Sequence, residues 1–235
     1  MNRIRHLTAV SLIGTAVTLL APVVAFGQGS ITTDTIVVYM NATVGTNNTA
    51  SGLRSFAQGV GCTATGNYSS ARGSNVTAYG EACHAEGIAT IASNSGAFAS
   101  CHAEGWQSVA SGLYGSHAEG YATIASSTAA HSEGSGTTAS GARSHAEGLT
   151  TVASGSRAHA EGNNTTASGT DSHAAGKYAY ATNNYTYVWS DGTATGSSST
   201  NQYTVYASCG IRLLGGATVG VRGGDISMGM FTNTP

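Results

Sequence analysis

Seven histidines and six glutamates occupy fixed positions of one repeated motif, His-Ala-Glu-Gly. Each glutamate follows its histidine by two residues, and the seventh copy has alanine in the glutamate position. Side chains two residues apart on a β-strand lie on the same face, so stacked copies would form parallel columns of imidazoles and carboxylates. The members of these columns are His84, His102, His117, His131, His145, His159 and His173, and Glu86, Glu104, Glu119, Glu133, Glu147 and Glu161.

Three kinds of chemistry fit such columns. The interpretation that we favour is structural: imidazoles and carboxylates pair within a repeat, between repeats or between chains. Carboxylates favour the charged form of a neighbouring imidazole. This interpretation therefore predicts raised histidine pKa values, and a stability that falls as pH rises through the folded-state pKa.

Metal binding is the second kind, because His and Glu are ligands for Zn²⁺ or Ni²⁺, and the seven histidines are its candidate residues. An array repeated in every copy, without a closed set of four ligands, is however a weak signature of a metal site. Catalysis is disfavoured, since an active site is one constellation and not seven. We expect no enzyme activity and no cofactor.

The motif recurs with a period of 14 residues, which defines the elements that position these side chains. Ten copies share one phase between residues 42 and 183, with one step of 18 and one of 15 among steps of 14. A second half-motif, Thr-Ala-Ser-Gly, keeps the same phase. Two short strands and two tight turns fill 14 residues. The sequence therefore predicts an all-β fold, a two-sided parallel β-roll of about ten rungs about 4.8 Å apart, with an interior of Ala, Val and Ile.

Glycine and hydroxyl columns accompany the motif. The motif glycine, as in Gly134, is expected in a turn that needs positive φ, and a second turn column is expected at Gly141 and its equivalents. We interpret a third column as a hydroxyl ladder satisfied by neighbouring rungs and water. An ice-binding surface would favour paired Thr-x-Thr, and alanine is the second member here. The hydroxyl column comprises Thr90, Ser108, Thr123, Thr137, Thr151 and Thr165.

Composition excludes several classes of protein. Charged residues make up 9% of the 235 residues, against roughly 25% in typical globular proteins, and 33 residues are glycine. A small-residue chain that folds usually does so by repetition. The formal net charge of −2 provides no basic footprint for nucleic acid, so no nucleic-acid partner is expected.

The N-terminal residues have the pattern of a targeting segment. Arg3 and Arg5 precede an apolar run over 7–21, and small residues within 25–27 suit cleavage before Gln28. The mature chain has no further apolar run of 18 or more residues, so no membrane span is expected in it. We expect the protein to be secreted or held at the cell surface, in association with the outer membrane. The predicted organisation is a signal peptide over 1–27, an N-terminal β segment over 28–41, β-roll head repeats over 42–183 and a C-terminal β region over 184–235.

Two cysteines share one motif position in consecutive rungs, at Cys83 and Cys101. A separation of one rung lies within the Cα distance of a disulfide, and an exported chain can form disulfides. This pair is therefore a disulfide candidate, and two stacked, buried thiols in place of serine are the alternative. No partner can be deduced for Cys62 or Cys209.

The Ser-x-Ala-x-Gly pattern at a 14-residue period resembles the head repeat of YadA-like trimeric autotransporter adhesins, also called the haemagglutinin-type repeat, over about 42–183. Segments 187–191 and 201–210 are similar to the region that often closes such heads. The resemblance implies a left-handed parallel β-roll, a homotrimer of chains side by side, and a role in cell adhesion with host or matrix surface molecules as partners. The His-Ala-Glu-Gly variant is similar to repeats of phage tail and other bacterial surface proteins. A structural component of a tail fibre or appendage is one alternative, and a histidine-rich metal-binding solenoid is another.

Overall fold

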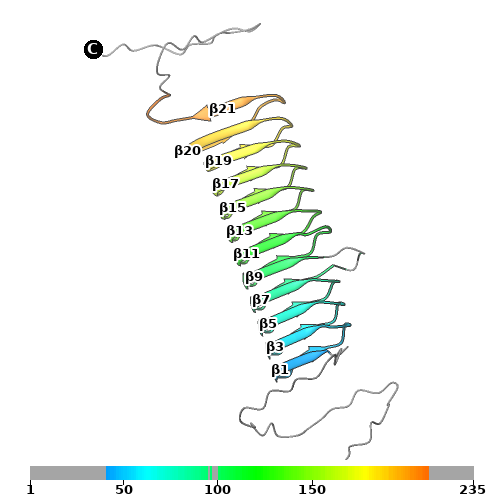
Figure 1. Ribbon diagram of the computed structural model, residues 1–235. Helices are drawn as coiled ribbons and strands as arrows, with labels where there is room; N and C mark the ends of the chain where they lie inside the picture. The colour runs from blue at the N-terminus through cyan, green and yellow to red at the C-terminus, as the bar shows by residue number, and fades with distance from the viewer. Residues whose placement is uncertain (1–40, 95, 97–99, 212–235) are drawn as a thin grey trace, which may run out of the picture. The chain divides into compact units, whose positions relative to one another are not determined.

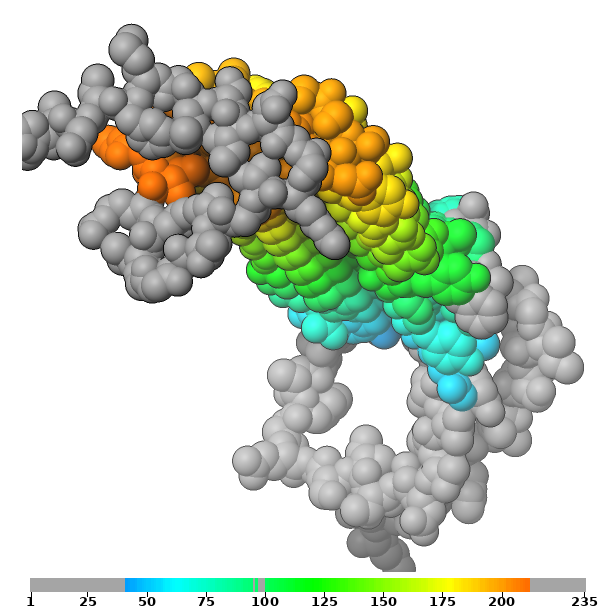
Figure 2. All heavy atoms as spheres, turned by 90° about the horizontal axis from the view of Figure 1, so that it is seen from above, coloured from blue at the N-terminus to red at the C-terminus, as the bar shows by residue number. Residues whose placement is uncertain are grey.

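The computed structural model describes residues 41–94, 96 and 100–211, and every regular element in these ranges is a β-strand. The strands form one coil in which each turn stacks on the turn before it (Figure 1). The space-filling view shows the turns as contiguous layers (Figure 2). No helix long and apolar enough to cross a membrane occurs in the described residues. The predicted signal peptide over 1–27, most of the predicted N-terminal β segment (28–40) and residues 212–235 lie outside these ranges.

Each turn of the coil begins with a long strand, and in most turns a strand of two residues follows. The long strands are β1 (Ala42–Thr46), β3 (Phe56–Val60), β5 (Ser70–Ser74), β7 (His84–Ile88), β9 (His102–Trp106), β11 (His117–Tyr121), β13 (His131–Ser135), β15 (His145–Leu149), β17 (His159–Asn163), β19 (His173–Ala181), β20 (Tyr187–Gly196) and β21 (Tyr203–Tyr206). The short strands are β2 (Thr49–Ala50), β4 (Thr63–Ala64), β6 (Thr77–Ala78), β8 (Ile91–Ala92), β10 (Val109–Ala110), β12 (Ile124–Ala125), β14 (Thr138–Ala139), β16 (Val152–Ala153) and β18 (Thr166–Ala167).

Strands of neighbouring turns pair in parallel, with equivalent motif residues side by side. In the pairing of β13 with β15, for example, His131 aligns with His145. The two longer steps do not disturb this register, since His84 aligns with His102 and His102 with His117. Their extra residues are therefore absorbed between strands. The predicted all-β parallel roll with 14-residue repeats is confirmed.

The coil has about twelve turns, two more than the sequence predicted. Strand β20 aligns Tyr187 with His173 of β19, and β21 aligns Tyr203 with Tyr187. The described part of the predicted C-terminal β region thus continues the same coil. Tyrosine replaces histidine and the motif glycine is absent in these turns, so counting motif copies missed them.

Alanine methyl groups fill the core. The second residue of each long strand from β3 to β20 and of each short strand from β4 to β18 is fully buried, and most of these residues are alanine, as at Ala118 and Ala125. The expectation that isoleucine lines the interior is wrong, because Ile88, Ile91 and Ile124 are 53%, 38% and 39% exposed. The isoleucines alternate with inward-facing residues, since Ile124 lies between the buried Thr123 and Ala125 and therefore points outward.

The hydroxyl column lies inside the coil, where all six of its members are fully buried. One hydrogen bond between hydroxyls of neighbouring rungs is found as expected: the Oγ1 atom of Thr123 donates to the Oγ atom of Ser108, at 3.0 Å. Within a rung, the Oγ1 atom of Thr137 contacts the Oγ atom of Ser132 at 2.7 Å. In contrast, the Oγ1 atoms of Thr90 and Thr151 have no hydrogen-bond partner. A buried column cannot present an ice-binding surface.

The glycine columns act differently from the prediction. Gly134 has the expected positive φ, 105°, but lies within strand β13 and not in a turn. A Cβ atom there would lie 2.3 Å from the carbonyl oxygen of Gly148 in the next turn. Gly141 does not have a left-handed φ. A Cβ atom there would lie 1.9 Å from the carbonyl oxygen of Gly155 in the next turn, which excludes a side chain. The left-handed turn positions hold residues such as Ala122 and Thr150, with φ of 51° and 55°.

Candidate functional site: the histidine–glutamate ladder

The histidine and glutamate columns lie on the outer face of the long strands. In β11, Ala118 points inward and is fully buried, while the flanking His117 is half-buried and Glu119 is exposed. Alternation along the strand therefore separates the alanine core from the polar columns. Seven consecutive turns, from β7 to β19, contribute one histidine each. We refer to these seven histidines and the six motif glutamates as the ladder.

The imidazole rings of the ladder stack along the coil. Ring centroids of neighbouring histidines are 4.6 to 5.1 Å apart. From His102 to His159 the rings are within 11° of parallel, whereas His84 meets His102 edge-on at 86°. Tyr187 and Tyr203 extend the stack at 4.8 Å per step. The predicted column of imidazoles is confirmed.

The glutamates change partner halfway along the ladder. In the first three turns each contacts the histidine of its own turn, as in the His84 Nε2–Glu86 Oε2 distance of 3.4 Å. In the later turns each contacts the histidine of the following turn. Glu133 lies 3.4 Å from His145 in this way, and Glu161 lies 3.1 Å from His173. The predicted pairing within and between rungs is thus found in both forms.

The electrostatics of His117 run opposite to the expected direction. Burial lowers the pKa of this imidazole, and the neighbouring His102 and His131 lower it further. The carboxylates of Glu119 and Glu104 oppose the shift but do not reverse it. The expectation that the glutamates raise the histidine pKa is therefore wrong at this position. At His117, burial and the two stacked imidazoles together outweigh the two carboxylates.

Some of the predicted metal candidates converge in groups of three. His131, Glu133 and His145 each offer one ligand atom, and these atoms lie within 4.8 Å of one another. His159, Glu161 and His173 form a second such group. Among the described residues, the remaining candidates His84, His102 and His117 do not belong to a group of three ligands.

The two candidate disulfide cysteines are neighbours in the interior. Cys83 and Cys101 are both buried thiols in the structure, and the backbone N–H of Cys101 donates to the Cys83 Sγ atom at 3.3 Å. The side-chain hydrogen bond between the two thiols raises the pKa of Cys83 and lowers that of Cys101, which also receives a bond from Ser116. The arrangement matches stacked thiols in place of serine, and the disulfide stays a prediction.

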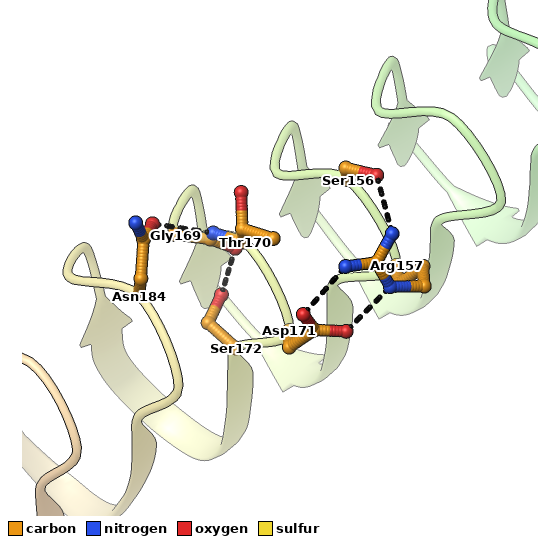
Figure 3. A network of polar contacts seen from close by, with 7 residues as sticks. All are labelled: Ser156, Arg157, Gly169, Thr170, Asp171, Ser172 and Asn184. Carbon is orange, nitrogen blue, oxygen red and sulfur yellow. Dashed lines mark hydrogen bonds and ion pairs between the residues drawn. The ribbon is translucent and has the colours of Figure 1, made fainter.

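The turn edge beside the ladder carries an ion pair between consecutive turns (Figure 3). Arg157 donates from Nε and Nη2 to the two carboxylate oxygens of Asp171, at 2.6 and 2.7 Å. These bonds hold the pKa of Asp171 below its usual range. On the same edge the Asn184 side chain accepts a hydrogen bond from the backbone N–H of Thr170, at 2.8 Å. Exposed pairs of this kind contribute little to stability, so they support the register without determining it.

An exposed apolar column was missed by the sequence reasoning. It consists of Ile88, Trp106 and Tyr121, which align in consecutive turns and are 53%, 52% and 48% exposed. The rings of Trp106 and Tyr121 meet edge-on at 5.3 Å. Ile91 and Ile124 are exposed on the short strands of the same turns. The signal was present in the sequence, because a large residue follows the motif glycine in three successive copies.

The fold and the ladder together define a parallel β-solenoid built from 14-residue repeats. No family model matches the chain, and no curated protein matches it.

Proposed function

We propose that this chain is an exported, non-enzymatic protein of the bacterial surface, with an adhesin-type head that serves cell adhesion or extracellular structure. The observation that carries the proposal is the periodic exterior. Equivalent outward side chains recur in register over consecutive turns, as His131 and His145 do between β13 and β15. A surface of this kind offers many equal contacts and suits an extended partner better than a small substrate.

Binding through such a surface would depend on the number of contacts. A single turn presents only a small area to a partner, so a single contact would be weak. Joining several equal sites raises the overall affinity by about 10² to 10⁴ without a new contact. Molecules of a host or matrix surface, which are themselves repetitive, are the partners that we propose.

A homotrimer would multiply this effect, and the apolar column offers a surface for its assembly. Contiguous exposed apolar side chains mark interaction sites, and Trp106 and Tyr121 are among the residue types enriched in interfaces. A second copy of this chain is the occupant that we propose, because only a partner with the same repeat stays in step with the column over successive turns. Three copies joined along this column would bury it.

The proposal is tested by a binding measurement with a matched pair of variants. The exported chain is applied to immobilised extracellular-matrix proteins and to host cells, and a double variant Trp106→Ser/Tyr121→Ser is compared with Leu149→Ser. Serine already occupies this column at Ser74 and Ser135, so the substitutions suit the fold. We expect the double variant to lose avidity by about 10²-fold or more, and Leu149→Ser, which lies beyond Ser135, to retain it. Failure of the unaltered chain to reach the cell surface, or to bind either target, would refute the proposed function.

A further inference from the structure

We propose that His159, Glu161 and His173 form a binding site for one divalent transition-metal ion of the zinc type. The inference concerns the end of the ladder and does not depend on the proposed adhesive function. Two imidazoles and one carboxylate are an established ligand set for Zn²⁺, which takes three protein ligands and leaves a fourth position for water. The three ligand atoms lie within 4.8 Å of one another.

The geometry of this group differs from that of the rest of the ladder. The His159 and His173 rings are 4.6 Å apart and inclined by 27°. The rings of His131 and His145, in the other group of three, are parallel to within 1°. The lone pair of an imidazole nitrogen lies in the plane of its ring, so two rings stacked face to face must be inclined to each other to share one ion. The carboxylate is already in place, since His173 Nε2 lies 3.1 Å from Glu161 Oε1.

The nitrogen that would complete the group makes no hydrogen bond. His159 Nε2 is shielded from solvent and has no hydrogen-bond partner, although Glu147 Oε1 lies 3.4 Å away; His117, His131 and His145 share this property, so the inclination of the rings is what singles out this group. A buried polar nitrogen without a partner is unfavourable, and an ion would satisfy it. The carboxylates of Glu147 and Glu161 would together balance the two positive charges of the ion.

The group stands at the end of the glutamate column. In the next turn Ala175 occupies the glutamate position, and in the turn after it Trp189 does. Glu161 is therefore the last carboxylate of the ladder. His173 also lines an open hollow of about 430 Å³ beside Tyr187 and Tyr203. Bonds of about 2.0–2.1 Å to both imidazoles require the rings to swing toward each other, which half-exposed side chains do readily.

The test is a Zn²⁺ titration of the full chain, purified without a polyhistidine tag and freed of metal by a chelator. We expect one ion per chain in the tightest class of sites, measured by calorimetry. His173→Gln and Glu161→Gln should each weaken this binding about tenfold or more. His102→Gln is the matched control, because His102 belongs to the same stack but to no group of three ligands, and it should leave the affinity within about twofold.

Two further measurements keep the test decisive. Melting temperatures without metal show whether each variant folds. If His173→Gln does not fold, Glu161→Gln, which keeps the shape of the side chain, still tests the site. Co²⁺ provides a spectroscopic probe, since its visible absorption reports imidazole and carboxylate ligands and should be lost in Glu161→Gln. Absence of saturable Zn²⁺ binding would overturn the proposal. Equal losses of affinity in His102→Gln or His131→Gln would also overturn it, because they would show adsorption along the whole ladder.

Discussion

Gly134 and Gly136 lie two residues apart in one turn, and substituting each by alanine should have very different effects. At Gly134 the φ of 105° is unfavourable for alanine, at about 1–3 kcal/mol. The new Cβ atom would lie 2.3 Å from the Gly148 carbonyl oxygen, so β13 and β15 must separate locally. Weakening one or two hydrogen bonds between them adds about 1 kcal/mol each. We therefore expect Gly134→Ala to reduce the free energy of unfolding by about 4 kcal/mol.

Gly136→Ala is the matched control. Its φ is 65°, and the atom nearest to the Cβ atom that alanine would add is Thr150 Oγ1, at 3.8 Å. The left-handed conformation costs alanine about 1–2 kcal/mol, and the reduced freedom of the unfolded chain returns about 0.4–1 kcal/mol. Alanine already holds the equivalent position at Ala89 and Ala122. The net loss should therefore be about 1 kcal/mol or less.

Thermal melting followed by circular dichroism distinguishes the two variants. At about 2–4 °C per kcal/mol for a chain of this size, Gly134→Ala should lower the melting temperature by about 10 °C and Gly136→Ala by about 3 °C or less. Equal shifts would refute the reasoning, since they would mean that close stacking of the turns does not require the motif glycine.

Three further changes test the turns, the core and the ladder. Thr150→Asn should stabilise the protein by about 1 kcal/mol in denaturant unfolding, because a β-branched residue is strained at φ 55° and asparagine tolerates this region; a loss of stability would contradict this. Thr151→Val should leave the free energy of unfolding unchanged or raise it, since it removes a buried hydroxyl without a partner. Thr137→Val should lower it by about 1 kcal/mol, because the Thr137 hydroxyl is hydrogen-bonded. A larger loss in Thr151→Val than in Thr137→Val would contradict this reasoning. Because the folded-state pKa of His117 is lowered, the unfolded chain binds the extra proton, so melting temperature should fall as pH drops below about 6.5. His117→Gln should reduce this dependence, and an unchanged pH profile would show that His117 does not cause it.

The period of the coil could be predicted from the sequence, and the side of each short strand that faces the interior could not. Repeats of 14 residues with glycine at fixed points leave space for two strands and two turns, which fixes the stacking of equivalent residues. They do not state which alternate residues of a short strand point inward. The structure places Thr123 and Ala125 in the core, so the intervening Ile124 faces outward. The hydrophobicity of isoleucine therefore predicted the wrong side.

The ladder shows the same division between what spacing predicts and what it leaves open. Its existence followed from the positions of histidine and glutamate at i and i+2. The choice of partner did not, since a glutamate two residues away and one in the preceding turn are both within reach of the same imidazole. Glu119 contacts its own His117, whereas Glu133 contacts His145 of the next turn. Side-chain rotation decides between these contacts, and the same rotation brings three ligands together at His173.

The mass of the exported chain in solution, measured by light scattering on a sizing column, tests the proposed head most directly. An adhesin-type head of three chains predicts a mass three times that of one chain, reduced to the mass of one chain by Trp106→Ser/Tyr121→Ser but not by Leu149→Ser. A single-chain mass for the unaltered protein would contradict the trimer and the avidity that the proposed function requires.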